Sequence, residues 1–167
     1  MAKRHKGVLT VVIFSLLIAI ATGCNNDGES LSVKARSGKQ EILVPKENEQ
    51  SFASLLAGKE LADIPYIKLG SKVTTFGGQD LRRAEFNIED ILLAMDGRPK
   101  YKGVNTSIDL KHRGNKVSFK LPVNPSAFLS SNSEDYLPGK TLRGFRLTYQ
   151  LDNETYSSIF VLRTDAN

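Results

Sequence analysis

The residues in this sequence that could carry out acid–base chemistry are few and far apart. His112 is accompanied by only one other histidine, His5, and Asp109 precedes it by three positions. Residues three apart on a strand project from opposite faces, so this pair cannot act on one substrate. Neither Gly-x-Ser-x-Gly nor Ser-x-x-Lys, two spacings found around catalytic serines, occurs in the chain. We therefore predict no catalytic residue and expect His112 at the rim of a hairpin turn.

Two pairs of neighbouring carboxylates are the other candidates for chemistry. Glu89 and Asp90 are adjacent, so their side chains diverge, whereas acid–base catalysis on a glycoside needs two carboxyl groups that face one substrate. We interpret this pair as negative charge at the start of a helix. Glu134 and Asp135 lie in an oxygen-rich loop that could hold a weak Ca²⁺, but without EF-hand spacing a solvated loop is the simpler interpretation. With one Cys and two His, the sequence predicts no metal site and no cofactor.

A cluster of basic residues is the best candidate for binding. Asp109 is the only acidic residue between positions 98 and 120. Lys111, Arg113, Lys116 and Lys120 belong to one predicted hairpin, and the lysines should share its polar face or rim. Such a face could bind anionic lipid headgroups or an anionic wall polymer. The alternative is an ordinary solvated face whose lysines protect an edge strand from aggregation.

The first 24 residues have the organisation of an export signal. Lys3, Arg4 and Lys6 precede the apolar run Val8–Ala21. That run is shorter than the ~20 apolar residues of a membrane-spanning helix and suits the core of a signal peptide. Small residues follow it and end in Cys24, which is the only cysteine of the chain.

This pattern resembles the signal peptide of bacterial lipoproteins, with Ala21-Thr22-Gly23-Cys24 as its lipobox. The resemblance implies that residues 1–23 are removed and that Cys24 carries diacylglycerol. Two acyl chains anchor a protein stably. The protein would then lie on the extracytoplasmic face of the cell membrane, or at the outer membrane of a two-membrane cell. Because Ala21 replaces the usual large aliphatic residue, cleavage after Ala19-Ile20-Ala21, which would release a soluble protein, and an uncleaved anchor remain alternatives.

The charge and composition bound the classes of partner. Removing Lys3, Arg4 and Lys6 with the signal lowers the formal net charge of +5 by three. The basic character is therefore largely that of the signal, and together with export this argues against a nucleic-acid partner. A chain of 167 residues with 40% hydrophobic and 25% charged residues suits one globular domain with a tail.

Alternating apolar and polar residues dominate the second half of the chain. We predict a first strand at 41–44, further strands at 64–69, 72–76 and 81–86, a hairpin of 106–112 with 116–121, and a longer hairpin of 145–151 with 156–163. Helical spacing predicts a short helix within 51–62. The apolar residues Ile88, Ile91, Leu92 and Met95 favour one or two helical turns over 88–95, although Asp96-Gly97 is also a hairpin signal.

These elements predict a mainly β fold with one or two short helices. We expect a signal peptide at 1–23, a lipidated Cys24 with a flexible tether at 24–40, and a β-sandwich domain at 41–167. The arrangement resembles an immunoglobulin-like extracellular domain in its architecture, without the Cys–Trp–Cys signature of true immunoglobulins.

The sequence thus predicts a lipid-anchored envelope protein with a non-catalytic binding or accessory domain, whose partner is an anionic envelope polymer or an envelope protein. One alternative is an envelope hydrolase with an unrecognised site. Another is a regulatory subunit that docks a membrane protein through an exposed strand edge. A pocket that holds His112 would favour the hydrolase. A continuous positive face would favour binding of an anionic polymer. An uncapped edge strand or a large apolar patch would favour docking of a protein partner.

Overall fold

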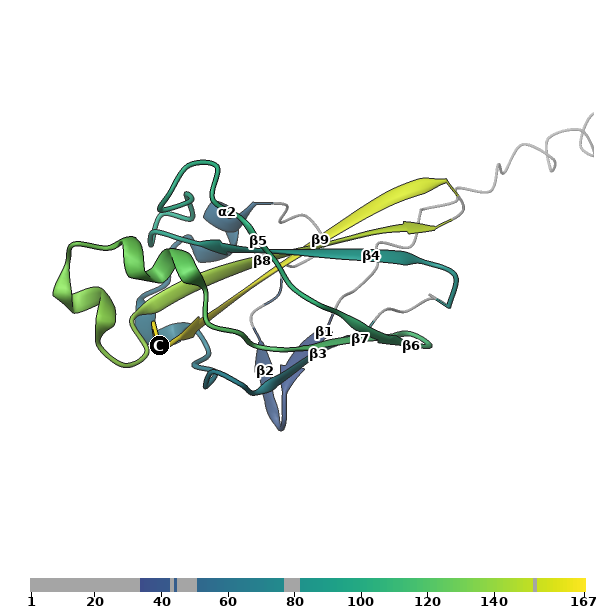
Figure 1. Ribbon diagram of the computed structural model, residues 1–167, viewed down its shortest axis with the longest axis horizontal. Helices are drawn as coiled ribbons and strands as arrows, with labels where there is room; N and C mark the ends of the chain where they lie inside the picture. The colour runs from purple at the N-terminus through teal and green to yellow at the C-terminus, as the bar shows by residue number, and fades with distance from the viewer. Residues whose placement is uncertain (1–33, 43, 45–50, 77–81, 152) are drawn as a thin grey trace, which may run out of the picture. The chain divides into compact units, whose positions relative to one another are not determined.

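The chain folds around two antiparallel β-sheets in this computed structural model, which describes residues 34–42, 44, 51–76, 82–151 and 153–167 (Figure 1). The first sheet has the strand order β2 (Gln40–Ile42), β1 (Lys34–Ser37), β3 (Lys72–Phe76), β7 (Lys116–Lys120) and β6 (Lys111–Arg113). The second has the order β5 (Thr106–Ser107), β4 (Glu85–Leu92), β8 (Thr141–Leu151) and β9 (Glu154–Thr164). The prediction of a mainly β fold is confirmed.

Apolar side chains from both sheets meet in one core between them. Val73, Val117 and Phe119 point inward from the first sheet. Phe119 lies 5.6 Å, centroid to centroid, from Phe145 of β8 and 6.4 Å from Phe160 of β9. The sheets therefore pack face to face as a β-sandwich, which leaves the alternate residues of each strand on the outer faces.

A short helix covers part of the outer side of the second sheet. Helix α2 (Phe52–Leu56) begins at Ser51, whose hydroxyl accepts a hydrogen bond from the Ser54 amide at 3.1 Å. Its apolar side packs against Ile159 and Val161 of β9. The helix predicted within 51–62 is thus confirmed in a shorter form. The 3₁₀ turns η1 (Leu61–Asp63), η2 (Pro125–Leu129) and η3 (Ser133–Tyr136) complete the described elements.

The prediction of helical turns over 88–95 is wrong, because residues 85–92 form strand β4. Ile88 is buried in the core between the sheets and Leu92 packs against Ala127 and Ala166, while Ile91 packs in the cluster around α2. Both faces of the strand are covered at this end, so apolar residues occur on both of them. The apolar–polar alternation of a half-exposed strand is therefore absent, and the spacing of the apolar residues matches that of a helix. The interpretation of Glu89 and Asp90 as helix-start charges is wrong for the same reason.

The structure also corrects the start of the folded part. Residues 34–37 form β1, which lies between β2 and β3, and Ala35 is buried in the core. The prediction that residues up to 40 belong to a tether is therefore wrong for 34–40. The polar residues Lys34, Arg36 and Ser37 flank Ala35, so no alternation of apolar residues indicates this strand in the sequence.

The remaining strand predictions have mixed outcomes. Strand β3 matches 72–76, and the long hairpin is confirmed as β8 and β9. The hairpin of β6 and β7 turns at Gly114-Asn115 as predicted, but 106–107 belong to the other sheet as β5. Residues 64–69 form no strand and contribute a single bridge from Tyr66 to Arg163. Residues 1–33, which include Cys24 and the predicted signal, lie outside the described part. No helix within that part is long and apolar enough to cross a membrane.

Candidate anionic-ligand face

The register of the β6–β7 hairpin places four predicted binding residues on one face. Lys111 lies opposite Ser118, and Arg113 lies opposite Lys116. Because residues two apart on a strand project from the same side, Lys120 shares this face with Lys116 and Ser118. Val117 and Phe119 project the other way into the core. The four cations therefore lie on the outer face of the first sheet.

Two more cations join this face from strands that are distant in sequence. Lys72 of β3 lies opposite Lys120, and Arg36 of β1 lies opposite Thr74 of β3. The sequence does not reveal either residue as part of this face, since Arg36 falls within the predicted tether at 24–40 and Lys72 lies outside the predicted basic cluster. Only the strand order reveals that they are neighbours of the hairpin. We call the outer surface formed by these six residues the basic face: Arg36, Lys72, Lys111, Arg113, Lys116 and Lys120.

The charges of the basic face are poorly compensated. All six side chains are exposed. Glu41, the register partner of Arg36, is an acidic residue on the same side of the sheet. Within the described part of the chain, no ion pair involves any of the six cations. A group of unpaired like charges on one surface produces a positive potential that attracts anions.

An aromatic ring lies among these cations. Phe76 is half-buried at the end of β3 and lies opposite Lys116. The guanidinium carbon of Arg36 lies 4.7 Å from the centroid of its ring, and the ammonium nitrogen of Lys116 lies 5.5 Å from it. Cation–π attraction therefore restrains one cation from β1 and one from β7.

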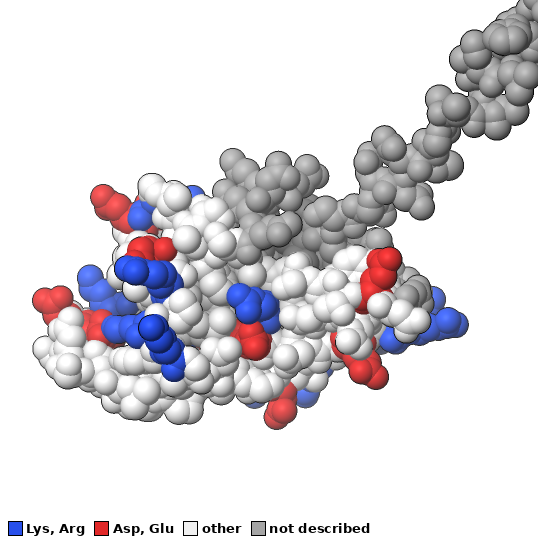
Figure 2. All heavy atoms as spheres, turned by 90° about the horizontal axis from the view of Figure 1, so that it is seen from above, with Lys and Arg blue, Asp and Glu red and all other residues white. Residues whose placement is uncertain are grey.

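The opposite outer face differs in its charge pattern. Viewed from the side of β4, β8 and α2, the surface shows basic and acidic groups side by side (Figure 2). Arg146 of β8 lies 3.5 Å from Glu89 of β4, and Arg98 pairs with Asp96. Charges on this face thus compensate one another locally, in contrast to those of the basic face.

His112 is the middle residue of the short strand β6, close to the hairpin turn. Its Nε2 lies 2.7 Å from the carbonyl oxygen of Gly114, and its ring lies 4.7 Å from that of Phe86 in β4. Neither of the two cavities characterised in the described part of the chain is lined by His112. The structure therefore gives His112 a packing contact with Phe86, and no ion pair with a carboxylate of the described residues involves it.

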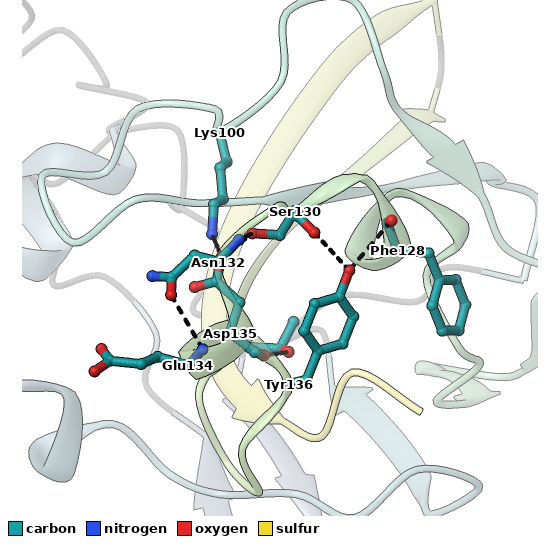
Figure 3. A network of polar contacts seen from close by, with 8 residues as sticks. Lys100, Phe128, Ser130, Asn132, Glu134, Asp135 and Tyr136 are labelled. Atoms are coloured by element: carbon teal, nitrogen blue, oxygen red, sulfur yellow. Dashed lines mark hydrogen bonds and ion pairs between the residues drawn. The ribbon is translucent and has the colours of Figure 1, made fainter.

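A polar network holds the loop that contains Glu134 and Asp135 (Figure 3). Both residues line a cavity of about 300 Å³. Asp135 accepts hydrogen bonds from the Lys100 ammonium and the Ser130 hydroxyl. The Tyr136 hydroxyl donates to the carbonyl oxygens of Phe128 and Ser130, at 3.2 and 2.7 Å. The floor of the cavity is apolar and includes the following side chains: Leu92, Leu93, Ala127 and Leu142.

This network does not form a cation site. The hydrogen bonds from Lys100 and then from Ser130 lower the pKa of Asp135, which keeps it ionised but paired. An ammonium group at the carboxylate competes with Ca²⁺ for the same oxygens. Within the described residues, no group of three or more His, Cys, Asp or Glu side chains could hold a metal ion.

Comparison of the chain with protein-family models, with curated proteins and with solved structures finds no match to any of the three.

Proposed function

We propose that this protein is a lipid-anchored extracytoplasmic protein whose non-catalytic domain binds an anionic polymer of the cell envelope through the basic face. The main observation that supports this proposal is the basic face. Its six cations come from β1, β3, β6 and β7, are exposed, and lack ion pairs within the described residues. A rigid sheet that presents several unpaired cations can release many counterions when one long polyanion binds, which favours polymers over single anions.

The anchor is the second part of the proposal. The basic start, the short apolar run and the position of Cys24 support lipidation at that cysteine and retention on the extracytoplasmic side of a membrane. The sandwich of two antiparallel sheets is compatible with an immunoglobulin-like domain, which is the finer fold class that we propose.

A charge-reversal experiment tests the binding proposal. The full-length protein in neutral detergent is added to anionic polymer purified from the envelope, and the dissociation constant is measured at several salt concentrations. We expect the triple substitution Lys111→Glu, Lys116→Glu and Lys120→Glu to weaken binding by more than about 100-fold, because it removes contacts and adds repulsion.

The matched control changes the same net charge elsewhere. Lys59, Lys68 and Lys102 lie outside the strands of the first sheet. Their combined change to Glu is expected to weaken binding by less than about tenfold, through long-range charge alone. Polymer retention that survives the Lys111, Lys116 and Lys120 changes, or equal losses in both triple variants, would show that the basic face is not the binding site.

The anchor has its own test. Mass spectrometry of the protein from membranes is expected to show a chain that begins at Cys24 with a diacylglycerol thioether. The Cys24→Ser variant should keep an intact signal or appear without the lipid. Recovery of a native chain with an unmodified Cys24 thiol would exclude the proposed anchor.

A second candidate function, docking of an envelope protein, is favoured by apolar side chains around η2 and η3. Phe128 is 53% exposed, Leu129 59% and Leu137 50%. Such a concentration of exposed apolar groups is typical of interaction surfaces. If a membrane protein binds there, it should co-purify with the wild-type protein but not with the Phe128→Ser, Leu129→Ser variant. Equal recovery with both would exclude this surface.

A further inference from the structure

Two short hydroxyl side chains occupy the centre of the basic face. Thr74 of β3 and Ser118 of β7 lie directly opposite each other in the register. Both project outward, because the neighbouring Val73, Thr75 and Val117 are buried on the inner side. Adjacent strands lie ~4.8 Å apart, so the two hydroxyls form a polar pair between neighbouring strands.

Long basic side chains surround this pair. Arg36 lies opposite Thr74 on one side, and Lys111 lies opposite Ser118 on the other, so all four residues form one row across β1, β3, β7 and β6. Four further neighbours lie two positions before or after Thr74 and Ser118 on the same strands, a distance of ~7 Å. They are Lys72, Phe76, Lys116 and Lys120. Because these short residues are ringed by long ones, the row should form a shallow depression with a hydroxyl floor and a cationic rim.

The two hydroxyls are available to a ligand. Within the described part of the chain, neither Thr74 nor Ser118 has a side-chain hydrogen bond, and neither hydroxyl is among the enclosed polar atoms that lack a partner. Ser118 is 9% exposed as a residue, so its hydroxyl is partly shielded from water. A hydroxyl that is partly shielded from water and flanked by cations is a good donor to an anionic oxygen.

We propose that this depression binds a phosphate group of a phosphodiester polymer, an inference that rests on the proposed function. Thr74 and Ser118 donate hydrogen bonds from the floor, and cations from all four strands approach from the rim. The two non-bridging oxygens of a phosphodiester project from a tetrahedral phosphorus, out of the plane of the chain, and can accept from floor and rim together. A carboxylate directs its two oxygens to one side within a single plane and meets fewer of these donors. The neutral hydroxyls therefore select phosphate among anions that the cations attract alike.

Phosphate diesters also occur in lipid headgroups, but the surroundings favour a polymer. Binding to a bilayer surface usually involves apolar side chains that enter the interface. The large apolar side chains exposed in the described part lie outside the strands of the first sheet: Met95, Val104, Val123, Phe128, Leu129, Tyr136 and Leu137. On the basic face itself, Phe76 is half-buried, and the cations of Arg36 and Lys116 lie over its ring. A face whose exposed side chains are cationic suits a polymer that lies on the sheet.

The experiment distinguishes the contribution of the two hydroxyls to polymer binding from that of the cations. Full-length protein in neutral detergent is titrated with inorganic polyphosphate and with polygalacturonate, a carboxylate polymer, over a series of salt concentrations. The test variant is Thr74→Val, Ser118→Ala. The matched control is Thr148→Val, Ser157→Ala, because these residues form the corresponding cross-strand pair on the outer face of β8 and β9. Neither variant changes the charge, and thermal unfolding verifies that both fold.

We expect the test variant to bind polyphosphate about tenfold more weakly, the loss of two hydrogen bonds to an anion, and polygalacturonate within about twofold of the wild type. The slope of log K against log salt should stay the same, because all cations remain. The control variant should bind both polymers as the wild type does. Phosphatidylglycerol added to the detergent micelles should not compete with polyphosphate.

Three results would overturn this inference. Unchanged polyphosphate binding by the test variant would exclude a role for the hydroxyls. Equal losses for both polymers would exclude selection of phosphate. Competition by phosphatidylglycerol would identify lipid as the ligand. Failure of the proposed function itself looks different, because the wild-type protein would then bind neither polymer in a salt-dependent manner.

Discussion

Asp90 of β4 and Arg143 of β8 form an ion pair that is enclosed between the two sheets. Their side chains are 0% and 1% exposed, and the Nε of Arg143 donates to Oδ1 of Asp90 at 3.0 Å. The Asn124 amide also donates to the Asp90 carboxylate, at 2.8 Å, and Arg143 donates to the carbonyl oxygen of Pro122 at 2.7 Å. The pair thus joins the second sheet to the segment that follows β7.

Breaking this pair from one side should be more damaging than replacing both residues. Asp90→Leu or Arg143→Met alone leaves a buried charge without its counterion, which we expect to lower the free energy of unfolding by about 3–5 kcal/mol. The double variant loses both charges and should be more stable than either single variant. Urea unfolding gives the free energy of unfolding of the wild type, the two single variants and the double variant. A double variant that shows the sum of the two single losses would contradict this account.

Gly97 should tolerate no side chain. Its φ of +80° lies in the left-handed region, and an added Cβ would lie 2.3 Å from the backbone nitrogen of Ala53 at the start of α2. Gly97→Ala combines backbone strain with displacement of the helix, and we expect a loss of about 3 kcal/mol or more. Gly114→Ala is the control, since its φ is +62° and no atom lies within 4 Å of the added Cβ, so about 1 kcal/mol is expected. Comparable losses in thermal unfolding would refute the proposed close contact.

The hydroxyl of Tyr149 should make the protein sensitive to alkaline pH. Burial, with a smaller contribution from Tyr156, raises the pKa of Tyr149 to about 12, and its hydroxyl has no hydrogen-bond partner within the described residues. The pKa of Tyr149 in the folded protein lies above the ordinary tyrosine value of about 10. Its effect on the free energy of unfolding is therefore constant below pH 10, and the free energy of unfolding falls between pH 10 and 12.

Tyr149→Phe should remove this part of the alkaline loss and leave stability near pH 7 unchanged or slightly higher, since an unsatisfied buried hydroxyl disappears. Unfolding measured at pH 7, 10 and 11 tests both statements. A smaller alkaline dependence should remain, because a hydrogen bond to Asp165 raises the pKa of Tyr66 as well. A variant that loses stability at pH 7 would show that the Tyr149 hydroxyl has a partner.

Asp135 should stabilise the η2–η3 end at neutral pH and lose this effect in acid. The Lys100 ammonium, followed by Ser130, lowers the pKa of Asp135 below its value in the unfolded chain. The contribution is therefore complete above the unfolded pKa of about 3.8 and disappears as the pH falls through the lower folded pKa.

The corresponding variant is Asp135→Asn. Because Lys100 is 35% exposed, solvent weakens the pair, and the expected loss at pH 7 is at most about 1 kcal/mol. Asp96→Asn, which alters a more exposed pair with Arg98, is the control and should leave stability unchanged. A difference between Asp135→Asn and the wild type that persists at pH 2 would show that charge is not the cause.

The sequence was most informative where one strand face is buried and the other is exposed. In β7, Val117 and Phe119 alternate with Lys116, Ser118 and Lys120, and this period of two specifies both the strand and the common face of its lysines. Local pattern failed in β4, where Ile88 and Ile91 meet different apolar partners on opposite faces. There the neighbouring sheet and α2, rather than the strand itself, set the burial.

The amino-acid sequence by itself determined the mainly β class, the two hairpins and the common face of Lys111, Arg113, Lys116 and Lys120, because these depend on side-chain alternation and turn residues over short distances. Only the tertiary structure decided that Arg36 and Lys72 complete the basic face, that Thr74 and Ser118 lie at its centre, and that Asp90 meets Arg143. Such contacts depend on the strand order of each sheet and on how the two sheets face each other. Residues far apart in the chain become neighbours through that arrangement, and no local period encodes it.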